Sequence, residues 1–186
     1  MEAINDILFW IFLWLLIWQA YILLFNKGIP DIKTAPVIRK EIIRRLQQDF
    51  ETRKDHPYTV IDLGAGTGSL TRDIAKSLPE AKVIGLEVDG FSYVLAQFFL
   101  KLSGLKNVHY KHLNFEDYDL SAASAVTLYL STEKTRALTT KFDQELKAKT
   151  FIASNSFPLN EPWVPIDQPE FKTLYPHQKT LYLYRK

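Results

Sequence analysis

The chain opens with an uninterrupted apolar run and then changes to short apolar stretches separated by polar residues. Residues 7–25 read ILFWIFLWLLIWQAYILLF and contain no charged residue. A helix over these positions spans about 28 Å, close to the hydrocarbon thickness of a bilayer. The run also lacks the polar face that a helix in a small core requires. We therefore predict one N-terminal transmembrane helix.

A cleaved signal peptide is the main alternative for this segment, and a hydrophobic core helix is a weaker one. A signal peptide requires a basic start, a shorter apolar core and small residues at a cleavage site. Here Glu2 and Asp6 precede the run, and Lys27, Lys33 and Arg39 are among the basic residues that follow it. The positive-inside rule then predicts a single-pass protein whose later residues face the cytoplasm at a bacterial inner membrane, or the matrix of a mitochondrion.

A segment with three helix breakers, Gly28, Pro30 and Pro36, follows the run and predicts a linker. Apolar residues then recur at helical spacing from Ile38 to Phe50, with basic and amide side chains between them. This pattern predicts an amphipathic helix. Its basic face either lies near anionic headgroups or is solvated while the helix covers the first strand.

From residue 56 on, short apolar runs alternate with segments of helical spacing. We expect strands at 58–63, 82–88, 107–113, 123–130, 150–154 and 180–184, and helices at 69–78, 91–102 and 133–147. Such alternation indicates an α/β fold with a mostly parallel sheet and helices on both faces. The expected division is a tail and anchor at 1–26, a linker and amphipathic helix at 27–55, and one α/β domain at 56–186.

Composition then excludes several classes of function. The 23 Lys and Arg against 21 Asp and Glu give a net charge of +2, which is too small to indicate nucleic-acid binding. The chain has no Cys, which excludes a disulfide scaffold, a catalytic thiol and a Cys-ligated zinc site. His109 and His112 share one expected strand without a metal-ligand spacing, so we expect no metal.

The candidate chemistry begins in the segment DLGAGTG at 62–68, between the first expected strand and the first expected helix. This turn lies at the carboxyl end of a parallel sheet, where open α/β folds bind ligands. Glycines let the backbone approach a ligand closely and permit positive φ. A dinucleotide fingerprint requires Gly at position 69, where this chain has Ser69. The loop therefore suits a nucleoside with an amino-acid tail.

Glu87 ends the second expected strand, 19 residues after Gly68. An acidic residue at this point accepts hydrogen bonds from both ribose hydroxyls. Asp89, two residues later, is a weaker candidate for the same role. The glycine loop and Glu87 together predict a nucleoside site at one end of the sheet.

The glycine motif followed by Glu87 resembles the class I S-adenosylmethionine-dependent methyltransferases over roughly residues 58–155. This resemblance implies a Rossmann-like fold with S-adenosyl-L-methionine as cofactor. It implies that Asp62 holds the amino end of the methionine moiety, through the loop or a water. Asn114 replaces the usual Asp near the adenine, and Phe115 either packs on the adenine or belongs to the core. The implied cofactor-binding residues are Asp62, Gly64, Ala65, Gly66, Gly68, Glu87, Asn114 and Phe115.

Three later segments are VTLYL at 126–130, NSFP at 155–158 and WVP at 163–165. They resemble the small protein-lysine methyltransferases, known as archaeal stand-alone enzymes and as membrane-anchored mitochondrial ones. The resemblance implies N-methylation of a lysine side chain in a membrane-associated protein. Few residues remain to enclose a small substrate, so we expect an open site that receives a side chain of another protein.

A lysine amine must be neutral to attack a sulfonium methyl group, and an apolar aromatic pocket lowers its pKa. We predict that Tyr129, at the mouth of the fourth strand, aims the amine, and that Phe157 and Trp163 form an apolar channel. Each also has a packing alternative. Tyr129 could fill the sheet edge, Phe157 could belong to the core, and Trp163 could be a lid over the sheet.

Two other functions stay open from the sequence: a methyltransferase acting on a lipid or quinone precursor at the membrane surface, and a non-catalytic membrane scaffold that binds the cofactor. A nucleic-acid base methyltransferase is disfavoured, because the Asn-Pro-Pro-Tyr or Asp-Pro-Pro-Tyr motif that grips a flipped base is absent after the fourth strand.

Overall fold

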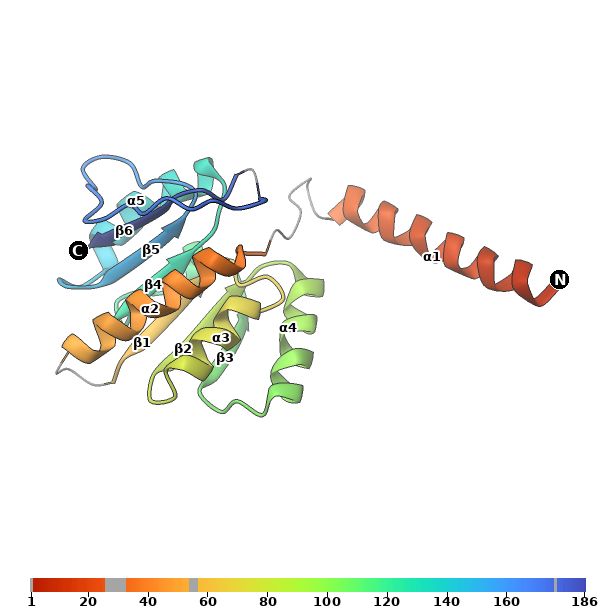
Figure 1. Ribbon diagram of the computed structural model, residues 1–186, viewed down its shortest axis with the longest axis horizontal. Coiled ribbons are helices and arrows are strands. Elements are labelled where there is room, and N and C mark those ends of the chain that lie inside the picture. The colour runs from red at the N-terminus through yellow and green to blue at the C-terminus, as the bar shows by residue number, and fades with distance from the viewer. Residues whose placement is uncertain (1, 26–32, 54–56, 176) are drawn as a thin grey trace. The chain divides into compact units, whose positions relative to one another are not determined.

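The computed structural model describes residues 2–25, 33–53, 57–175 and 177–186, with the side chains of 5–19 and 21 in the first of these ranges. The chain forms two compact units, 1–32 and 33–186. The first unit contains helix α1, Glu2–Phe25 (Figure 1).

Large apolar side chains of α1 are exposed along its described length. Trp10 and Trp14 are 65% and 60% exposed, and the ring of Trp14 stacks on Trp18 with centroids 5.7 Å apart. Among the residues whose placement is described, none of the helices combines the length and the apolar content that crossing a bilayer requires. The predicted transmembrane segment 7–25 lies partly outside the described side chains, at 20 and 22–25, and stays a prediction.

The second unit contains one sheet with the strand order β3-β2-β1-β4-β5-β6. The strands are β1 Thr59–Leu63, β2 Lys82–Glu87, β3 Val108–His112, β4 Ala125–Leu128, β5 Phe151–Asn155 and β6 Leu181–Arg185. Strands β1 to β5 pair in parallel, and β6 pairs antiparallel to β5. The expected strands lie within two residues of these bounds. The predicted α/β fold with a mostly parallel sheet is confirmed.

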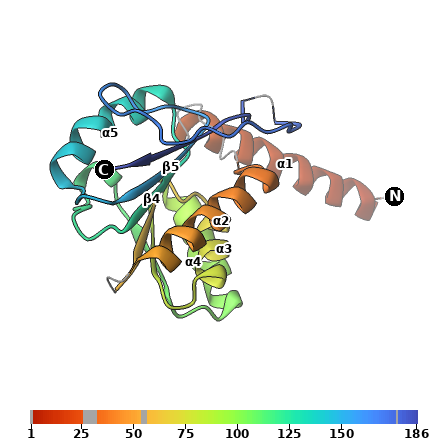
Figure 2. The same ribbon diagram turned by 60° about the vertical axis from the view of Figure 1, so that its left-hand side comes forward.

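Helices cover both faces of this sheet (Figures 1 and 2). They are α2 Pro36–Thr52, α3 Ser69–Ser77, α4 Gly90–Ser103 and α5 Thr132–Glu145, with a short 3-10 helix η1 at Phe115–Asp117. Successive strand residues point to opposite faces. Val60 therefore packs in the cluster with α2 and α3, whereas Ile61 packs in the cluster with α5. Strands β1, β4 and β5 are buried along their whole length, whereas β3 at the edge has three exposed residues.

Helix α2 covers the sheet as part of the second unit. Ile38, Ile42 and Leu46 recur every four residues, are 0–1% exposed, and pack in one cluster with Val60. The structure therefore supports the alternative in which this amphipathic helix covers the sheet. Because α2 is part of this core, the compact unit begins at Lys33 and includes the predicted amphipathic helix.

Candidate active site

The loop between β1 and α3 is a tight bend in which Gly64, Gly66 and Gly68 have φ angles of 73°, 55° and 74°. The N–H groups of Gly64 and Ala65 both donate to the carbonyl of Leu86 in β2, at 2.9 Å, and the N–H of Gly68 donates to the carbonyl of Ala65 at 2.9 Å. These donors are thus used within the protein. The loop does not present them as the free N–H groups with which a phosphate-binding loop holds its ligand.

Two of the glycines are required for different reasons. A Cβ atom on Gly68 would lie 2.1 Å from the hydroxyl oxygen of Tyr110, whose O–H donates to the Gly68 carbonyl at 2.9 Å. A Cβ atom on Gly64 would lie 2.8 Å from a methyl group of Leu130, just beyond β4. Gly68 is buried, whereas Gly64 is exposed. Gly68 therefore maintains the packing beneath the loop, and Gly64 keeps its outer surface accessible to a ligand.

The carboxylate of Glu87 is directed at this loop. It is 8% exposed, and its two oxygens accept hydrogen bonds from the N–H of Gly66 at 2.7 Å and of Asp89 at 2.8 Å. Each carboxylate oxygen has a further lone pair, so Glu87 can also accept from a ribose hydroxyl. The side chain of Asp89 instead caps α4 by accepting from the N–H of Ser92 at 2.8 Å. Glu87 is therefore the better ribose ligand of the two acids.

Asp62 lies beneath the loop and connects three elements. Its oxygens accept hydrogen bonds from the hydroxyls of Thr71 in α3 at 2.6 Å and Thr127 in β4 at 2.7 Å. Burial raises the pKa of Asp62, and the two hydroxyl bonds oppose that rise. The side chain is 4% exposed, so it can act on a ligand only by positioning the loop. This geometry supports the first of the two predicted routes for Asp62, the one through the loop.

Asn114 and Phe115 follow β3 at the same end of the sheet, where the N–H of Leu113 donates to the Glu87 carbonyl at 3.1 Å. The side chain of Asn114 is half-buried and caps η1, because it accepts from the N–H of Glu116 at 3.2 Å. Phe115 is 5% exposed and packs in the core cluster on the α5 face. The structure thus supports the core alternative for Phe115.

Tyr129 and Phe157 meet where β4 and β5 end. Their rings stack with centroids 6.3 Å apart and planes at 15°. Both side chains are half-buried. Burial raises the pKa of Tyr129, and hydrogen bonding with the side chains of Ser156 and Gln178 acts in the opposite direction. Tyr129 is therefore a neutral, oriented hydroxyl beside an apolar ring at physiological pH.

The described ring contacts of Trp163 are with residues other than this pair, and the channel of Phe157 and Trp163 stays a prediction. The Trp163 ring makes edge contacts with Phe142 of α5 and Tyr184 of β6, both at 6.2 Å between centroids. The N–H of Leu159 donates to the Tyr184 hydroxyl at 2.9 Å, which turns the chain onto the α5 face of the sheet. These contacts support the packing alternative for Trp163, in which its ring covers the sheet.

Gln178 is a site residue that the sequence did not indicate. It is 0% exposed, and its carbonyl oxygen accepts from the Asn155 amide at 3.2 Å and from the N–H of Ala35 at 2.6 Å. Its amide donates to the carbonyl of Lys33 at 3.0 Å. Gln178 therefore joins the start of the compact unit to the end of β5, beside Tyr129. A single Gln in a loop carries no sequence signal for this role.

The comparison with protein families agrees with this geometry. Residues 62–167 match the ANTKMT methyltransferase domain, a span that covers more than half of the chain and includes the glycine loop, Glu87 and Tyr129. The chain belongs to this family. The protein is therefore a class I S-adenosylmethionine-dependent methyltransferase, and the predicted enzyme class and cofactor are confirmed.

Individual relatives support the same assignment. The methyltransferase is 28% identical over 138 residues to a protein-lysine N-methyltransferase of Saccharolobus islandicus, covering 74% of this chain and 83% of the relative. An RNA methyltransferase of Salinibacter ruber, solved with S-adenosyl-L-homocysteine, aligns with a TM-score of 0.68 at 24% identity over 84% of this chain and 93% of that one. A precorrin-6y C5,15-methyltransferase of Geobacter metallireducens aligns with a TM-score of 0.55 at 17% identity, over 85% and 95%. These two structures are similar in fold.

The described residues also fit the cofactor chemically. The exposed Gly64 leaves the outer surface of the loop open, and the loop has no side chain larger than a methyl group at 64–66. Glu87 retains acceptor capacity for the ribose. The glycine loop could therefore take the methionine tail of S-adenosylmethionine, with its sugar beside Glu87. Asp62 supports the loop from below.

Proposed function

We propose that this methyltransferase transfers a methyl group from S-adenosylmethionine to the side-chain amine of a lysine in a membrane-associated protein. The observation that carries the proposal is the stacked pair of Tyr129 and Phe157 next to the glycine loop. Leu130, the residue after Tyr129, approaches Gly64, so the pair stands beside the loop that takes the methionine tail. The likeness to an archaeal protein-lysine N-methyltransferase supports lysine as the acceptor.

The aromatic pair can prepare an amine for attack. Bound S-adenosylmethionine supplies an electrophilic methyl group on a sulfonium that is a good leaving group. The rings of Tyr129 and Phe157 reduce hydration of an inserted ammonium and so favour its loss of a proton to solvent. The neutral Tyr129 hydroxyl can then accept a hydrogen bond from the amine and orient its lone pair. Rate enhancement comes mainly from this positioning and desolvation.

The membrane part of the proposal depends on the sequence of residues 1–45. The apolar run 7–25 has acidic residues before it and basic residues after it, which favours a single-pass anchor with the compact unit on the cytoplasmic or matrix side. Anchoring would confine the enzyme to substrates at the same membrane and raise their effective concentration.

Radiolabelled S-adenosylmethionine incubated with the full chain and membranes from a strain lacking this gene tests the acceptor. We expect the label in protein bands, and acid hydrolysis of those bands should release methylated lysine. Label recovered in the organic extract would instead indicate a lipid or quinone-precursor acceptor. No transfer to membranes, soluble proteins or lipid extract, despite binding of S-adenosylhomocysteine, would favour the non-catalytic scaffold.

Tyr129→Phe tests the proposed role of the hydroxyl. The variant keeps the ring that stacks on Phe157 and removes one oriented hydrogen bond. Since such a bond contributes about 1–1.5 kcal/mol, kcat should fall roughly 10-fold. The affinity for S-adenosylhomocysteine should stay within about twofold, because the glycine loop and Glu87 are unchanged. Tyr175→Phe, on an exposed loop tyrosine, is the matched control. An unchanged kcat in Tyr129→Phe would remove this role.

A further inference from the structure

Helix α4 packs on the sheet through one side and exposes large apolar residues on another. Its buried positions are Ser92 and Ala96, whereas Val94, Phe98 and Leu102 are 62%, 54% and 69% exposed. Residues spaced by four share one side of a helix, so these three form a continuous strip, the α4 apolar face. A surface helix ordinarily buries its apolar residues, but α4 has this second, exposed apolar strip besides the Tyr93, Ala96 and Leu100 that pack against the core.

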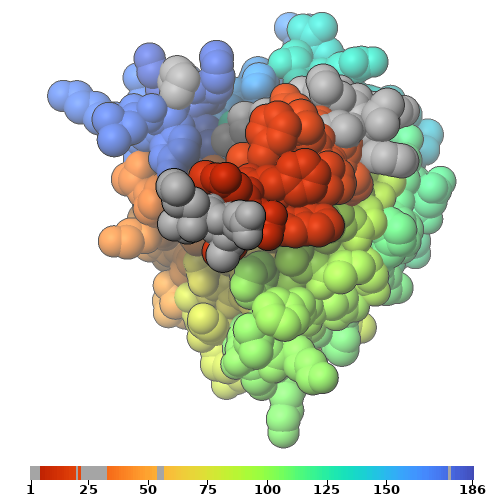
Figure 3. All heavy atoms as spheres, turned by 90° about the vertical axis from the view of Figure 1, so that its right-hand side faces the viewer, coloured from red at the N-terminus to blue at the C-terminus, as the bar shows by residue number. Residues whose placement is uncertain are grey.

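The position of α4 in the sheet explains how this arrangement holds. α4 contacts β2 and β3, at the edge of the sheet (Figures 1 and 2). Tyr93 anchors its first turns by stacking on His112 of β3, with centroids 5.1 Å apart. The sheet therefore holds α4 through Tyr93 and the small residues. The α4 apolar face is exposed at the surface of the unit. Figure 3 shows the surface that α4 contributes in yellow-green to green.

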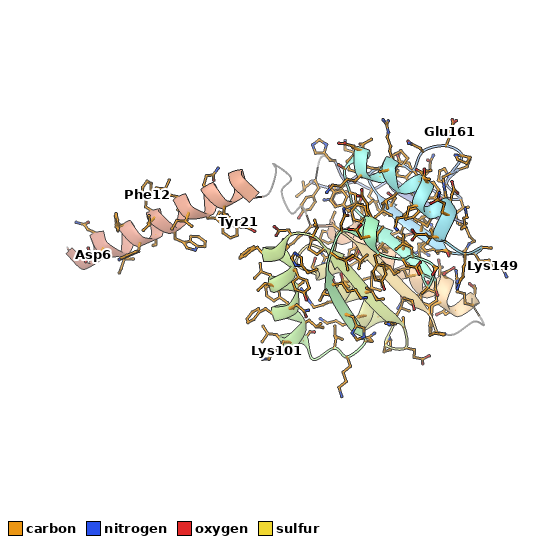
Figure 4. The ribbon with its side chains drawn as sticks, turned by 180° about the vertical axis from the view of Figure 1, so that it is seen from behind. Asp6, Phe12, Tyr21, Lys101, Lys149 and Glu161 are labelled. Carbon is orange, nitrogen blue, oxygen red and sulfur yellow. The ribbon has the colours of Figure 1, made fainter. Side chains whose placement is uncertain are left out.

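The surroundings of this face are basic. Between Gly90 and Phe115 the sequence has no Asp or Glu, and its charged residues are Lys101, Lys106 and Lys111. All three lysines are exposed. Lys101, labelled in Figure 4, lies in the last turn of α4 and Lys106 follows the helix, whereas Lys111 lies over the ring of Tyr118 on the α5 side of the sheet. Val88, 56% exposed, extends the apolar surface beyond the start of the helix. An apolar strip bordered by lysines, with no acid along the helix, suits a surface that is both apolar and anionic.

We propose that the α4 apolar face inserts into the headgroup and acyl boundary of an anionic lipid bilayer. Helices that lie in this boundary bury apolar side chains there and present Lys to anionic headgroups. A nucleic acid would neutralise the lysines and leave Val94 and Leu102 without an apolar partner. The inference rests on the membrane association proposed above.

The insertion would also orient the active site. Glu87 and the capping Asp89 immediately precede α4, so the cofactor site adjoins the end of the helix that carries Val94. A bilayer that contacts α4 therefore brings the open site close to the lipid surface. The acceptor lysine would then lie near the headgroups, on a membrane protein or a protein bound to its surface.

The absence of Cys from the full chain allows a clean test by single-site labelling. Val94→Cys in the full chain is labelled with a polarity-sensitive nitrobenzoxadiazole probe and mixed with phosphatidylcholine–phosphatidylserine vesicles that contain doxyl-labelled lipid. Arg136→Cys is the matched control, because Arg136 is exposed on α5, which covers the opposite face of the sheet. We expect at least a twofold fluorescence rise and strong doxyl quenching at 94, with little change at 136. Adding Lys101→Glu and Lys106→Glu should reduce the quenching at 94 at least threefold.

Vesicle sedimentation of the same samples separates this inference from the function on which it rests. If the protein sediments with the vesicles but the probe at 94 is not quenched by doxyl lipid, the insertion of α4 is wrong and membrane association is retained. Equal doxyl quenching of the probes at 94 and 136 would also overturn the inference. So would a probe at 94 whose fluorescence already indicates an apolar environment without vesicles and does not respond to doxyl-labelled lipid. Chain that does not sediment overturns both the insertion and the proposed membrane association.

Discussion

Replacement of Glu87 by alanine should weaken binding of S-adenosylhomocysteine roughly 10- to 150-fold, or about 1.5–3 kcal/mol. The carboxylate is the charged acceptor that we assign to the ribose hydroxyls. It also fixes the loop through the N–H of Gly66 at 2.7 Å, so its removal loosens the site as well as the sugar contact. Titration calorimetry on the full chain measures the affinity, at a temperature where circular dichroism shows the variant folded.

Asp89→Ser is the matched control for this measurement. It removes a carboxylate two residues away, while serine still caps α4 in place of the aspartate that accepts from Ser92. The affinity of Asp89→Ser should therefore stay within about threefold of the original value. If Asp89→Ser loses the affinity and Glu87→Ala retains it, the ribose ligand is Asp89, and our assignment is wrong.

Gly68→Ala should lower the free energy of unfolding by at least about 3 kcal/mol. A left-handed backbone at a non-glycine residue contributes about 1–2 kcal/mol of this loss. The remainder comes from the new methyl group, whose Cβ would overlap the hydroxyl of Tyr110 at 2.1 Å and its ring carbon at 2.5 Å. Tyr110 is 6% exposed in the core and cannot move aside without disturbing neighbouring side chains.

Gly104→Ala separates the two contributions. Gly104 has a φ of 68°, close to that of Gly68, but its Cβ would meet no atom within 4 Å. The control should therefore lose only the backbone contribution, about 1–2 kcal/mol. Urea unfolding followed by circular dichroism gives both values. Equal losses in the two variants would show that the contact between Gly68 and Tyr110 does not constrain the loop.

The strands and the ligand loop were predictable because local sequence determines them. Buried strands such as β4 and β5 are short, mostly apolar runs. The glycines at 64, 66 and 68 have positive φ angles, which glycine adopts more easily than other residues. The Glu87 carboxylate was predictable from its position at a strand end. In each case, the residues that determine the local structure lie within a few positions of one another in the sequence.

Features that depend on distant contacts were not predictable. The pattern of α2 indicates an apolar face but does not identify the partner that buries Ile38 and Leu46. The sequence therefore does not show that the compact unit begins at Lys33. After β5, the N–H of Leu159 donates a hydrogen bond to the Tyr184 hydroxyl, and Trp163 packs on Tyr184 at the α5 face of the sheet. Gln178 bonds to residues more than 140 positions earlier, and no local pattern encodes that.

The internal bonding of the glycine loop bears on how the enzyme distinguishes its cofactor from ATP, which carries the same adenosine. Glu87 would serve the ribose of either molecule. The N–H groups of Gly64, Ala65 and Gly68, however, already bond to carbonyl oxygens, and that of Gly66 bonds to Glu87. A triphosphate would find none of these four donors available and would meet the negative charge of Glu87. The enzyme would then distinguish the two molecules by the tail of the ligand rather than by its base or sugar.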